Sequence, residues 1–192
     1  MEYNVVLGII SVVIGLAGYV PYFIELMHRT IKPHSFSWLV WTITQSTAFY
    51  ASAVKGGGTG AWALGAQLIL MVLVLIISLF RGEKEITRLD KASFIIALLG
   101  VGLWVITTNP LWSVAIVAGV DAAGFVPTIR KSYKKPYEES IWVYACTFFA
   151  FFISLFALQS VSLITTIYPV VICFAEVVLV ATILYRRSKA SR

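Results

Sequence analysis

Charged side chains are scarce in this sequence. Only 12% of its 192 residues are Asp, Glu, Lys or Arg, whereas a soluble domain contains about 25%. The hydrophobic residues make up 59% of the chain, and they come in blocks of roughly 20, the length that a bilayer-spanning helix needs. The shortage of charge excludes an ordinary water-soluble domain and favours an integral membrane protein surrounded by a lipid bilayer.

Cysteine and histidine are also few, and neither has the spacing of a metal or catalytic site. Cys146 and Cys173 lie inside apolar runs, which is typical of buried thiols. His28 and His34 flank a basic loop, and we expect them to be solvated. There is no glycine-rich phosphate loop and no Ser-His-Asp set. The sequence therefore predicts no metal, no cofactor and no enzymatic activity, and an intramembrane enzyme is the weakest hypothesis.

Seven apolar blocks predict an all-α integral membrane fold of seven transmembrane helices. The start of the chain lacks the basic region that opens a signal peptide, so we expect the first block to be retained as a helix. The expected spans run from about Tyr3 to Met27, Ser37 to Val54, Ala61 to Phe80, Ala92 to Thr107, Leu111 to Ile129, Ser140 to Leu158 and Leu163 to Tyr185.

The basic residues follow every second span. Of the 15 Lys and Arg residues, only Lys55 follows an even-numbered span. Loops rich in Lys and Arg stay in the cytoplasm, so we expect the N-terminus outside, the C-terminus inside and a bacterial inner (plasma) membrane as the location. The net charge of +6 then reflects topology, and it indicates no nucleic-acid partner. The fourteen Lys and Arg residues that follow odd-numbered spans are Arg29, Lys32, Arg81, Lys84, Arg88, Lys91, Arg130, Lys131, Lys134, Lys135, Arg186, Arg187, Lys189 and Arg192.

The sequence also resembles itself. Gly18-Tyr19-Val20-Pro21 near the end of the first span matches Gly124-Phe125-Val126-Pro127 near the end of the fifth, and a Lys-Pro segment with Ser37 matches one with Ser140. Two three-helix units of the same orientation need an odd number of crossings between them. We therefore predict a 3+1+3 arrangement of parallel repeats with a cleft between them, in which residues 1–86 and 110–192 are the repeats and 87–109 is a linker helix.

This arrangement resembles the SWEET and PQ-loop (MtN3-like) transporter superfamily, which includes sugar transporters, lysosomal amino-acid exporters and the KDEL receptor. The superfamily's paired Pro-Gln appears here as Pro21-Tyr22 and Pro127-Thr128. The resemblance implies alternating access with Pro21 and Pro127 as hinges, since proline deletes a helix hydrogen bond. The alternative is that proline is merely frequent in transmembrane helices. We expect the helices to approach closely beside each proline, at Gly15, Gly18, Gly119 and Gly124.

Two carboxyl groups lie in the middle of expected spans. A charge at that depth costs several kcal/mol, so Asp121 and Glu176 should face a cavity or a partner. Glu25 should reach interfacial water, and the other acidic residues fall in loops or at the N-terminus. The resemblance implies proton coupling through an acidic residue in the fifth span, the place of Asp121. The alternative is a neutral carboxyl group that hydrogen-bonds between helices.

Further polar and aromatic residues are candidates for the same cleft. In SWEET-type transporters a polar residue on the third and seventh spans contacts the substrate, and the resemblance implies this role for Gln67 and Glu176. Gln45, Trp41 and Tyr168 would line the cleft beside them. Two tryptophans, Trp38 and Trp142, are expected at the membrane–water interface, where aromatic belts form.

The function that follows is transport of a small polar solute by alternating access between the two bundles. An amino acid, a sugar or a cationic metabolite fits, with proton coupling through Asp121 and Glu176 as one version. The alternative is a receptor or sorting protein on the same scaffold, similar to the KDEL receptor, that binds a ligand without moving it. Because one chain holds both halves, a monomer would suffice, and a homo-oligomer stays open.

Overall fold

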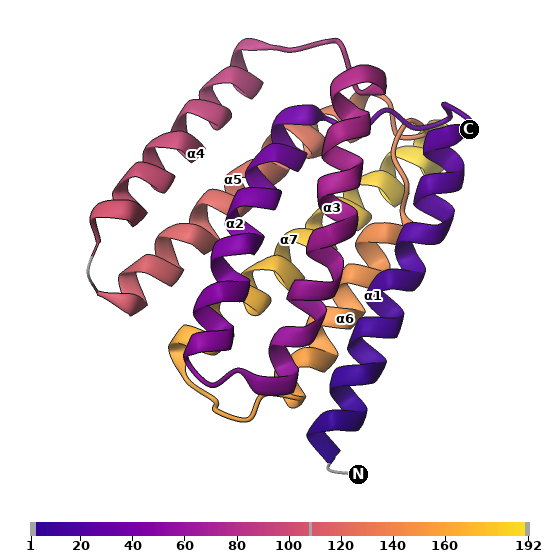
Figure 1. Ribbon diagram of the computed structural model, residues 1–192. Helices are drawn as coiled ribbons and strands as arrows, with labels where there is room; N and C mark the ends of the chain where they lie inside the picture. The colour runs from indigo at the N-terminus through magenta and orange to yellow at the C-terminus, as the bar shows by residue number, and fades with distance from the viewer. Residues whose placement is uncertain (1–2, 108, 191–192) are drawn as a thin grey trace.

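A computed structural model describes residues 3–107 and 109–190, and within these ranges every regular element is helical (Figure 1). The seven α-helices match the seven apolar blocks one by one, which confirms the all-α fold and the number of helices. The elements are α1 (Tyr3–Met27), α2 (Ser35–Val54), the short 3₁₀ helix η1 (Gly58–Ala61), α3 (Trp62–Arg81), α4 (Arg88–Ile106), α5 (Pro110–Lys134), α6 (Trp142–Phe156) and α7 (Leu163–Ala190).

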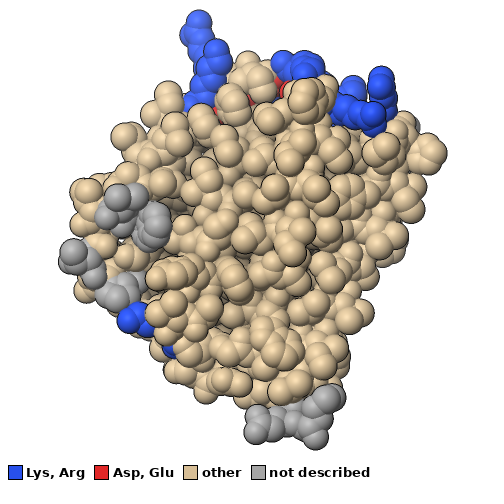
Figure 2. Space-filling model, viewed as in Figure 1, with Lys and Arg blue, Asp and Glu red and all other residues tan. Residues whose placement is uncertain are grey.

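Four of these helices are long and apolar enough to cross a membrane: α1, α3 with η1, α5 and α7. At a rise of about 1.5 Å per residue, the 15-residue α6 is shorter than a bilayer core. The flanks of the bundle expose apolar side chains, among them Phe80 and Phe174. Figure 2 shows Lys and Arg gathered mainly at one end, near the C-terminus. These features fit a membrane protein, and we call that end the basic end.

Local chemistry moves some helix boundaries away from their expected positions. Thr87 and Asp90 form a capping box at the start of α4: the Thr87 amide donates to Asp90 Oδ2 (2.7 Å) and the Asp90 amide to Thr87 Oγ1 (3.3 Å). The helix therefore begins at Arg88, about one turn before the expected Ala92. The expectation that Asp90 lies in a loop was wrong.

Six of the seven helices form one bundle. Helix α3 contacts both α1 and α2, and α7 contacts both α5 and α6. In addition, α1 packs on α6 and α2 packs on α5. Helix α4 lies to one side, mainly against α5 (Figure 1), and Ala97 clusters with Val40 and Val120. The core lies inside the bundle.

Close helix approach requires glycine at Gly18 and Gly124 but not at Gly119. A Cβ atom on Gly18 would lie 2.5 Å from Cys146 Cβ and 3.1 Å from the Trp142 carbonyl oxygen. A Cβ on Gly124 would lie 2.9 Å from Trp41 Nε1. Gly119 is exposed and has no neighbour within 4 Å of such an atom, so its expected contact role was wrong.

We expect Gly18→Ala to destabilise the protein by about 1–3 kcal/mol, because the methyl group meets the Cys146 Cβ atom and the Trp142 carbonyl oxygen of α6, neither of which can rotate away. Thermal or denaturant unfolding in detergent micelles measures the change. Gly119→Ala is the matched control and should be neutral or slightly stabilising, since alanine favours a helix more than glycine does. Equal losses in the two variants would contradict the tight α1–α6 contact.

Candidate functional site

A cavity lies inside the bundle. Its volume is about 30 Å³, enough for about two water molecules. Six helices line it, all except α4. The lining residues are Tyr19, Trp38, Trp41, Gln45, Gln67, Met71, Asp121, Phe125, Val143, Tyr144, Thr147, Phe151, Tyr168, Ile172 and Glu176. All six residues predicted to contact a ligand are among them, although their role in binding stays a prediction.

Asp121 ties α5 to α2 and α7. Its side chain is 2% exposed, and its Oδ1 atom accepts hydrogen bonds from the Tyr168 hydroxyl on α7 (2.9 Å) and from Thr44 Oγ1 on α2. Its backbone carbonyl accepts a further bond from Trp41 Nε1 (3.3 Å). These neutral donors offset part of the cost of burying the carboxyl group. They supply no positive charge.

Gln67 lines the cavity from α3. Its Oε1 atom accepts a hydrogen bond from Thr147 Oγ1 on α6 (3.2 Å), and its Nε2 atom has no partner within the described chain. The amide stands where a Cβ on Gly15 would be, only 2.6 Å from Nε2. Glycine at position 15 therefore makes room for Gln67, and the amide keeps donor capacity for water or a ligand.

Glu176 is the least satisfied of the three groups. It is 3% exposed, and in the part of the chain that the structure describes its Oε2 atom has no hydrogen-bond partner. No salt bridge to Glu176 is formed among the described residues. A buried polar atom left without a partner costs about 1–3 kcal/mol, and more when it is charged. Such an atom beside a cavity is the natural contact for water, a proton or a cation.

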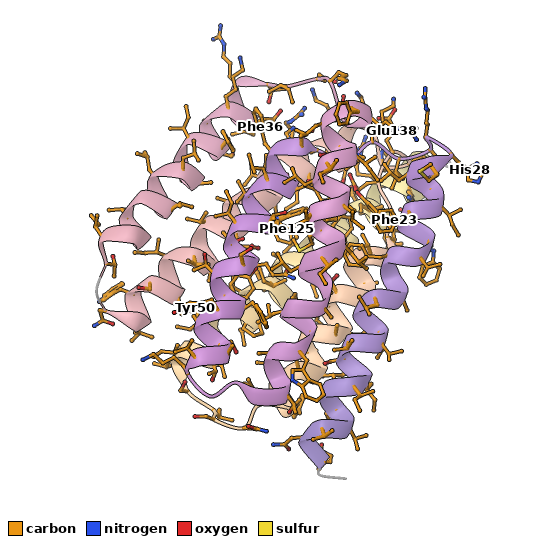
Figure 3. The ribbon with its side chains drawn as sticks, in the orientation of Figure 1. Phe23, His28, Phe36, Tyr50, Phe125 and Glu138 are labelled. Carbon is orange, nitrogen blue, oxygen red and sulfur yellow. The ribbon has the colours of Figure 1, made fainter. Side chains whose placement is uncertain are left out.

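The remaining predicted residues have mixed roles. Gln45 donates to the Leu64 carbonyl (2.9 Å), so part of its amide is committed to holding α2 on α3. Trp41 packs on Phe125 at a centroid distance of 4.6 Å, in the middle of the bundle (Figure 3). Trp38 is only 2% exposed and lines the cavity, so its expected place in an interfacial belt was wrong. Trp142, by contrast, is 61% exposed.

Polar contacts continue from the cavity to the basic end. The hydroxyl of Tyr144, a cavity residue, donates to Glu139 Oε1 (2.8 Å), and Glu139 forms an ion pair with Lys131. Both charged side chains are almost fully buried. Lys131 also donates to the carbonyl oxygens of Lys32 (2.6 Å) and Glu138 (3.0 Å). This cluster ties the loops before α2 and α6 together and closes the cavity at the basic end.

A second buried ion pair lies beside that closure. Arg130 donates to both carboxylate oxygens of Asp90, from Nε (2.9 Å) and Nη2 (2.8 Å). Burial alone would raise the pKa of the Asp90 carboxyl, but hydrogen bonds from Thr87 and Arg130 outweigh it and hold the pKa below its ordinary value of 3.8. His34 is fully buried, with Nε2 3.6 Å from Asp90 Oδ2, so its expected solvation was wrong; His28 is exposed as expected.

The other end of the bundle is closed by the segment that contains η1. Thr59 Oγ1 donates to the Ala157 carbonyl at the end of α6 (2.9 Å). Gly60 lies against Leu158, where a Cβ would be 2.7 Å from Leu158 Cδ2, and Gly8 of α1 lies against Thr59. The residues that line the cavity are all buried.

The proposed hinge residues sit inside unbroken helices. Pro21 lies within α1 and Pro127 within α5, and each follows an aromatic cavity residue by two positions, Tyr19 and Phe125. Pro169 lies within α7, directly after Tyr168. Each proline thus removes a helix hydrogen bond close to the cavity wall. Whether the helices bend there during a cycle stays a prediction.

Sequence reasoning missed the two threonines that organise the site. Thr44 binds Asp121 and Thr147 binds Gln67. They are 103 positions apart, the same spacing as between Ser37 and Ser140, so aligning the two halves residue by residue would have found them. Hydropathy does not reveal them, because threonine is common in transmembrane helices and usually bonds its own backbone.

We expect the stability of the basic end to depend on Asp90 in a narrow acidic range. Asp90→Asn breaks a buried pair with Arg130, and the loss should be about 3 kcal/mol near neutral pH. The pKa of Asp90 is lower in the folded protein than its ordinary 3.8. The stabilisation is therefore complete above pH 3.8 and is lost as the pH falls through the folded value. Thermal unfolding of both proteins across pH 3–7 measures the difference.

The protonation of His34 affects stability in a different pH range, so it serves as a control for the Asp90 effect. Burial lowers the pKa of His34 below its ordinary 6.5; Asp90 opposes this, while Lys131 and Arg130 add to it. Unfolding then takes up a proton just below pH 6.5, so wild type should lose stability there and His34→Gln should not. A difference between wild type and Asp90→Asn that stays constant down to pH 3 would contradict the buried pair.

No protein-family model matches this chain, and no curated protein or solved structure matches it.

Proposed function

We propose that the chain is a membrane transporter that moves a small polar solute by alternating access between two three-helix bundles. The observation that carries the proposal is the buried cavity: carboxyl and amide groups from several helices line it, and two of their polar atoms have no partner in the described chain. Buried polar atoms are nearly always hydrogen-bonded in proteins. Unpaired ones around enclosed free space therefore favour a ligand site.

The helix packing supports the 3+1+3 arrangement. The third helix of each triplet contacts the other two, and each triplet faces the other through equivalent pairs, α1 on α6 and α2 on α5. Helix α4 contributes no lining residue to the cavity among those described, as a linker would. The spacing of 106 positions that relates Pro21 to Pro127 also relates Gly15 to Asp121 and Tyr19 to Phe125. We take this as the pattern of two like-oriented repeats, related to the SWEET and PQ-loop superfamily.

The charges favour a cationic or zwitterionic solute over a neutral sugar. Asp121 and Glu176 have no basic side chain as a partner in the described chain, and a ligand ammonium group would supply the missing positive charge. The unpaired Nε2 of Gln67 can donate to a ligand carboxylate. A proton can replace the cation on a buried carboxyl group, which would couple transport to a pH gradient.

The basic end is then the cytoplasmic end. All described Lys and Arg side chains except Lys55 belong to segments at that end, as positive-inside topology requires. The N-terminus would lie outside, in a bacterial inner membrane. The cytoplasmic closure would be the Lys131–Glu139 cluster, and the outer closure would be η1 on the end of α6.

Flux into proteoliposomes tests the proposal. Uptake of radiolabelled lysine and neutral amino acids, with and without an inward proton gradient, should be reduced at least about tenfold by Asp121→Asn and by Glu176→Gln, because each replaces one of the two carboxyl groups of the cavity by a neutral amide. Glu85→Gln is the control, since Glu85 is a half-exposed residue of the basic end. Melting temperatures of all variants verify folding.

The outcomes separate the competing functions. Solute binding to wild type without any flux would favour a receptor or sorting protein. Unchanged flux in both variants would mean that the two carboxyl groups are not part of the transport site.

A further inference from the structure

A hollow of about 330 Å³ lies at the basic end, where α1 and α3 end. Its lining comes from the loop after α1, the last turn of α3 and the loop that follows α3. We call it the basic hollow, because four of its seven lining residues are Lys or Arg. The seven are Arg29, Lys32, Phe80, Arg81, Gly82, Glu83 and Lys84.

Three basic side chains of this hollow have no partner for their charge. Arg29, Arg81 and Lys84 are exposed and form no salt bridge among the described residues. None of the three donates a side-chain hydrogen bond to a backbone carbonyl in the described chain either, whereas Arg186 and Arg187 do. The positive charge of the basic hollow is therefore free to meet an anion.

The other charged groups of the hollow are already neutralised. Lys32 Nζ lies 2.9 Å from Glu138 Oε1. Glu83 is only 6% exposed; its Oε1 atom accepts two loop amides (2.8 and 2.9 Å) and its Oε2 atom lies 3.1 Å from Lys135 Nζ. The carboxylate of Glu83 is thus satisfied inside the protein, and it leaves the three unpaired cations to an external ligand.

Arg29 is held in a backbone conformation that glycine normally fills. Its φ of 58° lies in the left-handed region, where it is the one residue other than glycine in the described chain. The Arg29 amide donates to the Leu26 carbonyl (3.2 Å) and the Thr30 amide to the Glu25 carbonyl (3.0 Å), the pair of bonds that commonly ends a helix at a glycine. The fold alone favours glycine there, so an arginine indicates a use for its side chain.

The basic hollow adjoins the apolar flank of the bundle. Phe80, one of its lining residues, is 76% exposed. Met27, whose Sδ atom is 3.8 Å from Arg81 Nη1, is 59% exposed. Free positive charge and exposed apolar side chains therefore lie side by side, which suits a ligand that has an anionic head and a hydrocarbon chain.

We propose that the basic hollow binds the phosphate head group of an anionic phospholipid, with Arg29, Arg81 and Lys84 on the phosphate oxygens and the acyl chains along the apolar flank. Guanidinium and ammonium groups form charge-assisted hydrogen bonds with phosphate. No residue lines both this hollow and the central cavity. The lipid site is therefore separate from the proposed transport site and does not depend on transport.

Native mass spectrometry of the full chain in detergent tests the site. The probes are phosphatidylglycerol and phosphatidylcholine with identical acyl chains, which differ in the net charge of the head group. We expect phosphatidylglycerol to bind at least about tenfold more tightly, because the choline of the other lipid already neutralises its phosphate.

A matched pair of arginine variants separates a defined site from general surface charge. Arg81→Gln should weaken phosphatidylglycerol binding about fivefold, the loss expected for one basic side chain beside an anionic head group. Arg88→Gln should leave binding unchanged. Arg88 is exposed at the same end and forms no salt bridge in the described chain, but it does not line the hollow.

Arg29→Gly separates binding from folding. It should weaken phosphatidylglycerol binding about fivefold. Its melting temperature without added lipid should equal or exceed that of wild type, because glycine adopts the conformation of position 29 without strain. Weaker binding by a variant that is no less stable cannot result from damage to the fold.

Other results would overturn the proposal. Equal binding of the two lipids, unchanged binding in Arg29→Gly, or equal losses in Arg81→Gln and Arg88→Gln would mean that surface charge alone attracts the lipid. Glycerol phosphate that binds as tightly as phosphatidylglycerol would mean a site for a soluble phosphate. Selective lipid binding without any lysine flux rejects the transporter alone, and normal flux without selective binding rejects the lipid site alone.

Discussion

Burial of carboxyl groups without a basic partner is the constraint on which this structure depends. Every Lys or Arg that the structure describes near an acidic side chain is at the basic end, so the cavity carboxyls must be stabilised by neutral donors or by something that is not protein. Asp121 has such donors in Thr44 and Tyr168. Glu176 has none in the described chain. The two acids therefore differ: the first holds three helices together, and the second has no hydrogen-bond donor in the described chain.

At the basic end, unlike in the cavity, acidic and basic side chains lie together where three loops meet. Lys131 and Glu139 are buried as a pair, and the lysine also satisfies two loop carbonyls. Asp90 is held by Arg130 and at the same time caps α4. Such pairs contribute little net stability compared with apolar packing, but each fixes one loop in one position. The arrangement of the loops at the basic end is therefore specific.

The sequence predicted the helices and the cavity residues for the same reason. In an apolar chain the few polar groups at mid-span have to converge, because lipid offers them no hydrogen bond. Asp121, Glu176 and Gln67 could thus be identified without knowing which helices touch. The position of His34 could not, because its burial results from the docking of its loop beside α4. Trp38 and Gly119 failed for a related reason: depth along a helix can be read from sequence, but the direction in which a side chain points depends on the helix packing.

In the proposed repeat arrangement, the two halves of the cavity share positions but not chemistry. Gly15 and Asp121 are 106 positions apart, and Thr44 and Thr147 are 103 positions apart. In the first half the glycine leaves room for an uncharged amide that binds Thr147, and in the second half the corresponding place holds a carboxyl group that binds Thr44. If the halves rock against each other as proposed, the contact of Gln67 with Thr147 exchanges one neutral hydrogen bond for another. The contact of Asp121 with Thr44 would move an acid through the apolar interface between the halves, which costs several kcal/mol unless a proton or a cation accompanies it. Coupling of transport to a proton or a cation would then follow from the composition of this interface. The half that carries Asp121 and Glu176 would determine what is transported.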